Sequence, residues 1–153
     1  MHKIQMKKDN ARHSEQLNRM NALYKSGICF FCKKNYLSVG ASPEIYRNTS
    51  WYIKKNDYPY TGSTHHYLIV SNKHLNKITQ LSLSQWSKLR ETIKWLQKKL
   101  ASKGESIFIR SGDLRYTGAT FGHLHFHYVA GGPKKKGFKL RDNIRATLGY
   151  RKK

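Results

Sequence analysis

Three histidines alternate with apolar or aromatic residues in the stretch GHLHFHYV, residues 122–129. Successive side chains of a β-strand point to opposite faces, so we expect His123, His125 and His127 to project together while the intervening side chains anchor the strand on a core. A neutral imidazole is nucleophilic near pH 7, and it also transfers protons and ligates metals. The stretch therefore indicates a chemical site, with a metal-binding or merely solvated histidine face as the alternatives.

The loop ahead of these histidines carries residues suited to an anion. Gly112, Gly118 and Gly122 let a backbone approach a ligand closely, and Thr117 and Thr120 add hydroxyl donors. Three aligned imidazoles behind such a loop favour a functional site over a plain metal-binding or solvated face.

The only two cysteines, Cys29 and Cys32, form a C-x-x-C pair. In a chain without a signal-like apolar core, this spacing favours a metal clip or a redox pair over a structural disulfide. Two buried apolar cysteines are the remaining alternative. A structural zinc site takes four ligands, so the pair alone cannot complete one.

The net charge is the most extreme feature of the composition. Thirty Lys and Arg against eight Asp and Glu give +22 with His neutral. This charge favours nucleic acid, nucleotide phosphates or an anionic membrane face as partners, although a solvated lysine-rich surface also explains it. Eight acids are too few for paired-carboxylate glycosidase chemistry, for a hard-cation cage, or for cupin-like and metallohydrolase sites. No apolar run approaches the length of a membrane span, which predicts a cytoplasmic protein that does not enter membranes.

The remaining patterns predict the elements that position these residues. Apolar side chains recur at steps of three and four over residues 84–102, which predicts one long amphipathic helix. A shorter helix is expected over residues 10–26. Runs of β-branched and aromatic residues predict strands at 45–53, 66–70, 106–110 and 123–130. Strands, one long helix and further strands indicate a single α+β domain, with an antiparallel sheet and the helix on one face.

These motifs together resemble the histidine triad (HIT) superfamily. His123–Val129 resembles its signature of histidines alternating with apolar residues, and the cysteine pair resembles the C-x-x-C of many bacterial members. His66–His74 resembles the strand and turn that precede the signature. Asn56–Tyr60 is similar to the segment before that strand in the diadenosine-polyphosphate phosphorylase-like branch. Gly118–Thr120 stands where the superfamily has a phosphate-facing Gly-Gln-Ser, with Ala119 replacing the glutamine.

The resemblance covers residues 28–130 and implies the α+β HIT fold. That fold has an antiparallel β-sheet of about five strands with one long helix packed across it, and its members form homodimers. The resemblance divides this chain into an N-terminal helical extension (1–27), a HIT domain (28–132) and a basic C-terminal tail (133–153).

Carried over residue by residue, the resemblance makes His125 the nucleophile that attacks an α-phosphorus and forms a nucleotidyl-histidine. His127 would hold the phosphoryl oxygens or the leaving group. The implied nucleotide- or phosphate-binding residues are Asn56, His66, Gly118, Thr120 and His127. Zinc-bearing members hold a structural zinc with four residues that correspond here to Cys29, Cys32, His74 and His123, so His123 would serve the metal and not the catalysis.

The implied function is a nucleotide-binding hydrolase or nucleotidyl transferase that cleaves a phosphoanhydride or phosphoramidate at the α-phosphate. Its substrate would be a nucleotide or a dinucleoside polyphosphate. Two alternatives stay open. An enzyme resembling aprataxin, the DNA-repair branch, would remove adenylate from 5′-adenylated nucleic-acid ends and use the charge of +22 to hold a strand. A non-catalytic nucleotide- or RNA-binding module would keep the fold for recognition, but the intact His125 speaks against it.

Overall fold

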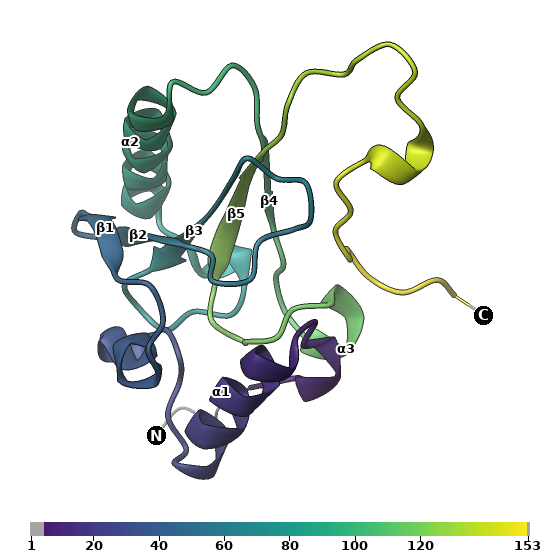
Figure 1. Ribbon diagram of the computed structural model, residues 1–153. Coiled ribbons are helices and arrows are strands. Elements are labelled where there is room, and N and C mark those ends of the chain that lie inside the picture. Colours follow the sequence, from purple (N-terminus) through teal and green to yellow (C-terminus); the bar gives the residue numbers. More distant parts are fainter. Residues whose placement is uncertain (1–4, 153) are drawn as a thin grey trace.

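The computed structural model describes residues 5–152 and shows one sheet with helices on both of its faces (Figure 1). The helices are α1 (Ser14–Lys25), α2 (Leu83–Leu100) and the short α3 (Leu114–Thr117). The strands are β1 (Glu44–Arg47), β2 (Trp51–Lys55), β3 (His65–Ser71), β4 (Ser106–Ile109) and β5 (His125–Ala130). Single 3₁₀ turns cover Lys8–Asn10, Cys32–Val39, Ile78–Gln80 and Leu140–Asp142. Among the described residues, none of the helices is both long and apolar enough to cross a membrane.

The five strands form one antiparallel sheet in the order β1-β2-β3-β5-β4. This confirms the expected α+β fold with about five strands, but the strand predicted over 45–53 is in fact a hairpin of β1 and β2. The turn forms because the Asn48 Oδ1 accepts hydrogen bonds from the backbone N–H groups of Ser50 and Trp51, each at 2.9 Å. Local side-chain bonding of this kind outweighs the strand preference of the aromatic neighbours.

One face of the sheet is covered by α2, as predicted. Ser82 caps this helix in a capping box with Gln85, which starts it at the expected point. The buried α2 residues Leu89 and Leu96 belong to a core cluster with the sheet residues Trp51, Ile53, Ile69, Phe126 and Tyr128. The alternation predicted for the histidine strand therefore holds on this side, because its intervening side chains anchor it under α2.

The opposite face of the sheet carries the histidines and is covered by α1 and the Cys32–Val39 turn. A second core cluster forms there from Met20 and Leu23 of α1, from Phe30, Phe31 and Tyr36, and from the sheet residues Tyr52, Leu68 and Val70. His127 stands opposite Leu68 in the β3–β5 register, and His125 stands opposite Val70. The same sheet thus has an apolar face under α2 and a histidine-bearing face toward α1.

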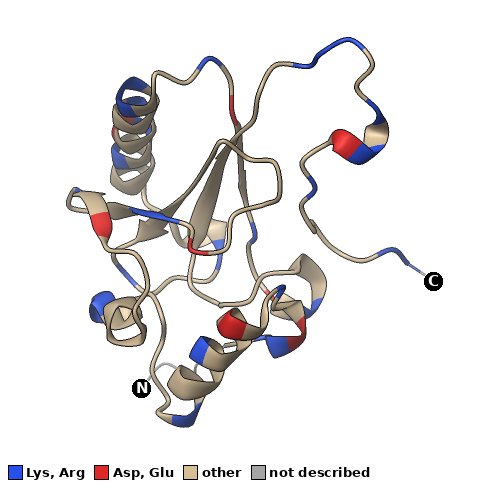
Figure 2. Ribbon diagram, in the orientation of Figure 1, with Lys and Arg blue, Asp and Glu red and all other residues tan. Residues whose placement is uncertain are grey.

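The chain after β5 swings away from the sheet and returns toward α3 (Figure 1). It is held at two points: the Thr147 carbonyl accepts hydrogen bonds from Arg110, and the Tyr150 hydroxyl donates to Asn10 Oδ1 at 2.5 Å. Lys and Arg are spread over this segment, α2 and the helical region around α1, with few acids between them (Figure 2). The positive charge therefore surrounds the histidine-bearing face and does not concentrate in one arm.

Candidate active site and metal centre

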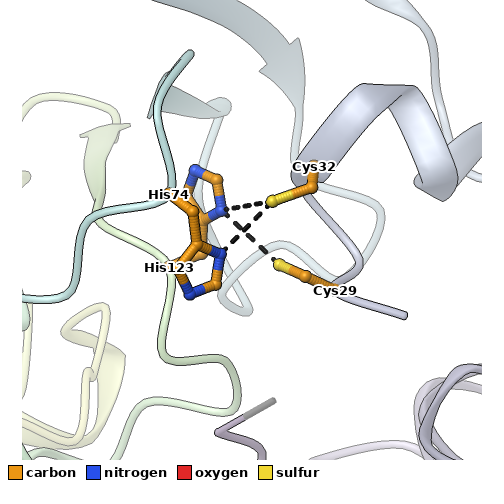
Figure 3. Close-up of side chains that lie close together, drawn as sticks. All are labelled: Cys29, Cys32, His74 and His123. Atoms are coloured by element: carbon orange, nitrogen blue, oxygen red, sulfur yellow. Dashed lines mark hydrogen bonds between the residues drawn. The ribbon is translucent and has the colours of Figure 1, made fainter. Parts of the chain in front are cut away.

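Two cysteines and two histidines meet beside the N-terminal end of β5 (Figure 3). The ligand atoms of Cys29, Cys32, His74 and His123 all lie within 4.8 Å of one another. The His123 Nδ1 is 3.5 Å from the Cys29 Sγ and 3.6 Å from the Cys32 Sγ, and the His74 Nδ1 is 3.2 Å from the Cys32 Sγ. A tetrahedral zinc ion, with bonds of about 2.0–2.3 Å, separates its ligand atoms by roughly 3.5 Å. The four residues therefore fit zinc in both chemistry and spacing.

The surroundings of this cluster orient its ligands. The His123 Nε2–H donates to the Ser71 carbonyl at 2.8 Å, which leaves the Nδ1 lone pair for a metal. The Asn35 side chain donates to the Cys29 carbonyl at 2.8 Å, and the chain after Cys32 turns back through Lys33 and Lys34 at positive φ. His123 lies just before β5, although the sequence placed it in the strand, and its side chain takes part in the cluster.

His125 is the first residue of β5 and lies buried at the end of a cavity. Its Nδ1 lies 2.6 Å from the His123 carbonyl, which can only accept, so Nδ1 carries the proton and Nε2 keeps its lone pair. Burial lowers the pKa of His125 to about 4, and the positive charges of Arg110 and Lys54 add to this effect. The imidazole is therefore neutral and nucleophilic at physiological pH.

His127 and His66 form a hydrogen-bonded pair that donor groups enclose at both ends. The Tyr60 backbone N–H donates to His66 Nδ1 at 3.1 Å, and His66 Nε2 lies 2.9 Å from His127 Nδ1. The Arg110 Nη1 lies 2.8 Å from the other nitrogen of His127, Nε2. Burial, followed by the charges of Arg12 and Arg110, lowers the pKa of His66 to about 3, and burial also lowers the pKa of His127 well below its usual value.

This arrangement has an unmet need for an acceptor. The Tyr60 N–H requires a lone pair on His66 Nδ1, so the neutral His66 carries its proton on Nε2 and donates to His127. The neutral His127 then carries its proton on Nε2, where it faces the donor groups of Arg110. Two donors directed at the same point favour an anionic oxygen between them. The geometry therefore suits a phosphate beside His127.

A cavity of about 220 Å³ extends from these histidines to α1. Its walls include the sequence-predicted residues His125, His127, Asn56, Gly118 and Thr120. His66 supports His127 from behind, and the Asn56 amide nitrogen lies 3.0 Å from its Nε2. The structure thus brings the predicted nucleotide- and phosphate-binding residues together at one cavity, apart from the cysteine cluster.

The cavity also contains four cations that the sequence did not single out. Arg12, Arg19, Lys54 and Arg110 line it, together with the single acid Asp57. Arg110 follows β4 and reads as an ordinary strand end, while the first two arginines come from α1 and the turn before it. Only the overall positive charge pointed to such residues, and it did not say which of thirty basic side chains would converge.

Arg110 is held firmly at the cavity. Its Nη2 donates to the Tyr60 hydroxyl at 2.8 Å and to the Thr147 carbonyl at 2.6 Å, and its Nε donates to the same carbonyl at 2.9 Å. Four hydrogen bonds thus fix the guanidinium beside His127. The segment after β5 is what supplies the Thr147 carbonyl, so this segment helps to build the site.

Comparison with known proteins places the fold. Residues 28–141 match the family described as scavenger mRNA decapping enzyme C-term binding. A HIT family hydrolase from Clostridium thermocellum is 25% identical, with a TM-score of 0.53 over 73% of this chain and 96% of that chain. A histidine triad protein from Clostridium difficile is 20% identical, with a TM-score of 0.53 over 72% of this chain and 96% of that one.

A zinc-bound histidine triad family protein from Mycobacterium smegmatis is 22% identical, with a TM-score of 0.51 over 73% of this chain and 78% of that chain. No curated protein matches the sequence. The family match takes in the cysteine pair, the Gly118 loop and all three aligned histidines, and the solved structures share the sheet that carries them. The chain therefore belongs to the scavenger mRNA decapping enzyme C-terminal family, within the histidine triad superfamily.

Proposed function

We propose that this protein is a nucleotide hydrolase or nucleotidyl transferase that works through a nucleotidyl-histidine at His125. The carrying observation is the hydrogen bond from His125 Nδ1 to the His123 carbonyl, because it leaves a neutral Nε2 lone pair in a cationic cavity. A HIT family hydrolase among the similar structures supports the assignment to this enzyme class.

In the first step the His125 Nε2 lone pair attacks the α-phosphorus of a bound nucleotide. A P–N bond to the imidazole forms as the phosphoanhydride or phosphoramidate bond breaks, and the leaving group departs with that electron pair and takes a proton from solvent. The His127 Nε2–H and Arg110 hold the non-bridging oxygens, while the loop at Gly118–Thr120 supplies further donors. These groups stabilise the charge that develops on phosphorus.

In the second step water attacks the same phosphorus. The P–N bond breaks, its electron pair returns to His125, and the water proton is released with the nucleoside monophosphate. An alcohol or amine in place of water would complete a transfer instead of a hydrolysis. Burial keeps the imidazole neutral between turnovers, so each cycle starts from a competent nucleophile.

We further propose a structural role for zinc at Cys29, Cys32, His74 and His123. When bound, zinc would supply a cross-link between the cysteine loop, the β3 turn and the start of β5. This cross-link would hold the His123 carbonyl, which in turn fixes the tautomer of His125.

A second candidate function is removal of adenylate from 5′-adenylated nucleic-acid ends. The observation that favours it is the net charge of +22, spread over α2, the segment after β5 and the region of α1 (Figure 2). A polyanionic strand would gain many phosphate contacts there. The family match, described by an mRNA decapping enzyme, agrees with a nucleic-acid 5′ end as the leaving group.

Acid-quenched mass spectrometry tests both candidates. The wild type and His125→Ala are mixed briefly with diadenosine polyphosphates, an adenosine phosphoramidate or 5′-adenylated DNA, together with the guanosine counterparts of the first two. We expect a nucleotidyl adduct on the wild type that is absent from the variant, and the productive substrate separates the two functions. Turnover by His125→Ala at the wild-type rate would exclude His125 as the nucleophile. Nucleotide binding without adduct or product from any substrate would favour the non-catalytic module.

A further inference from the structure

The cavity has two chemically different ends. The histidines, Arg110 and the Gly118 loop form the end suited to phosphate. The other end combines apolar walls from Met20, Phe30, Phe31 and Leu68 with the polar side chains Arg19, Lys54, Asp57 and Tyr58. A nucleotide has the same division, because its base presents flat apolar faces and a polar edge. If the α-phosphate lies at His125, as the proposed function requires, the base falls toward the α1 end.

Two polar atoms at this end are buried without a partner. Among residues 5–152, the buried side-chain nitrogens and oxygens that lack a hydrogen bond are the Arg19 Nη1 and the Tyr58 hydroxyl. Both residues line the cavity, and the Arg19 guanidinium lies 5.6 Å from the centre of the Tyr58 ring. Leaving such groups unpaired costs about 1–3 kcal/mol each. Both would be satisfied by the edge of a bound ligand.

The Arg19 guanidinium is also aligned from behind. Its Nη2 donates to Glu15 Oε1 at 2.6 Å, one turn earlier in α1. This ion pair fixes the plane of the guanidinium while leaving Nη1 free. An arginine oriented in this way presents its donors as a fork.

A buried ion pair lies at the same end. The Lys54 Nζ donates to Asp57 Oδ2 at 2.7 Å and to the Lys55 carbonyl at 2.8 Å, and the Lys54 side chain is only 1% exposed. The Asp57 Oδ1 is occupied by the N–H and hydroxyl of Ser42 at 2.7 and 2.6 Å. Because the acid is already engaged by three donors, the free hydrogen-bonding capacity of this end consists mainly of donors.

A surplus of donors selects a base by the acceptors on its edge. Guanine and hypoxanthine present two adjacent acceptors, O6 and N7, which arginine engages in a bidentate manner. Adenine replaces the first of these with an amino donor, and uracil offers one acceptor on the equivalent edge. We propose that this end of the cavity recognises a 6-oxopurine, with Arg19 as the residue that reads O6 and N7 and Tyr58 as an additional donor.

The proposal rests on the proposed nucleotide site and is tested by equilibrium binding, which does not require turnover. Titration calorimetry on the full chain compares GMP, IMP, AMP and UMP. We expect GMP and IMP to bind roughly ten- to a hundredfold more tightly than AMP, the range of one bidentate arginine contact. The analogue 7-deaza-GMP, which lacks the N7 acceptor, should lose most of that advantage. The analogue 7-methyl-GMP should bind less tightly than GMP, because methylation removes the acceptor and adds a positive charge facing Arg19.

Variants assign the preference to one residue. Arg19→Met should make the affinities for GMP and AMP equal, while Arg19→Lys, which keeps the charge but not the fork, should retain only a small part of the preference. Arg90→Met is the matched control, because Arg90 is exposed on α2 and does not line the cavity. It should leave the ratio unchanged.

The outcomes separate this inference from the function beneath it. Equal binding of GMP and AMP by the wild type, or a GMP preference that survives Arg19→Met, overturns the recognition of 6-oxopurines and leaves the nucleotide site standing. Absence of binding by all four nucleotides overturns the proposed function together with the inference.

Discussion

Substitution of either of two neighbouring histidines should have opposite consequences for metal and for chemistry. His123 and His125 are two residues apart, yet His123 contacts both cysteines while His125 lies in the cavity. We expect His123→Asn to lose bound zinc and much of its stability. We expect His125→Asn to keep the zinc and lose turnover.

The size of the effect follows from linkage between metal binding and folding. A ligand held at a thousand times its dissociation constant stabilises the folded state by about 4 kcal/mol. For a chain of this length, each kcal/mol shifts the melting temperature by about 2–4 °C. Loss of zinc from His123→Asn should therefore lower the melting temperature by roughly 8–16 °C. His125→Asn removes one buried hydrogen bond and should cost about 1–2 kcal/mol.

The assay combines zinc content by elemental analysis with thermal denaturation, before and after treatment with a chelator. Wild type and His125→Asn should hold one zinc per chain, and the chelator should bring both down toward the stability of His123→Asn. The chelator should leave His123→Asn itself unchanged. If purified wild type holds no zinc and gains no stability when zinc is added, the assignment of these four residues to a metal is refuted. Equal zinc content in all three proteins would refute the division of roles within the triplet.

Two further predictions concern the cavity. Arg110→Met should lower kcat by about 10²–10³-fold, because it removes donors that hold the phosphoryl oxygens beside His127. Arg115→Met, a change at an exposed arginine outside the cavity, should not do so, and a loss below threefold in steady-state assays of Arg110→Met would contradict the role of Arg110. Stability should fall as the pH drops from 6.5 toward 3, because the unfolded chain protonates His66 in this range while burial and then the charge of Arg12 hold the folded pKa at about 3. The contribution of His66 reaches about 2 kcal/mol at pH 5. Denaturant unfolding at several pH values should show a shallower slope for His66→Gln, and an unchanged slope would contradict this reasoning.

Much of the fold could be predicted because its patterns are periodic. The stripe on α2 and the alternation around Phe126 each follow from one side being buried, so the long helix and the two faces of β5 were found from sequence. The β1–β2 hairpin was missed because its turn depends on the side chain of Asn48, which bonds to the backbone two and three residues later. Short-range bonding of this kind leaves little trace in hydrophobic periodicity.

The candidate site divides in the same way. The positions expected to bind metal and phosphate form motifs with fixed spacing, so they could be named before the structure and are found close together. Arg12, Arg19 and Arg110 have no such spacing. They converge only because α1 packs on the histidine-bearing face, and because the chain after β5 returns to place the Thr147 carbonyl against Arg110. Contacts between segments so distant in sequence cannot be read from a local pattern.

The origin of these segments bears on how far the family can predict the substrate. The matched region, residues 28–141, contains the histidines and the loop at Gly118, which are the groups that act on phosphorus. Arg12 and Arg19 lie before it, and Thr147 and Tyr150 lie after it, yet all four line the same cavity. Chemistry and substrate choice are thus supplied by different parts of the chain. A relative with the same histidine strand but another N-terminal helix would keep the reaction and bind a different base, because the donors facing the base edge would no longer be the same.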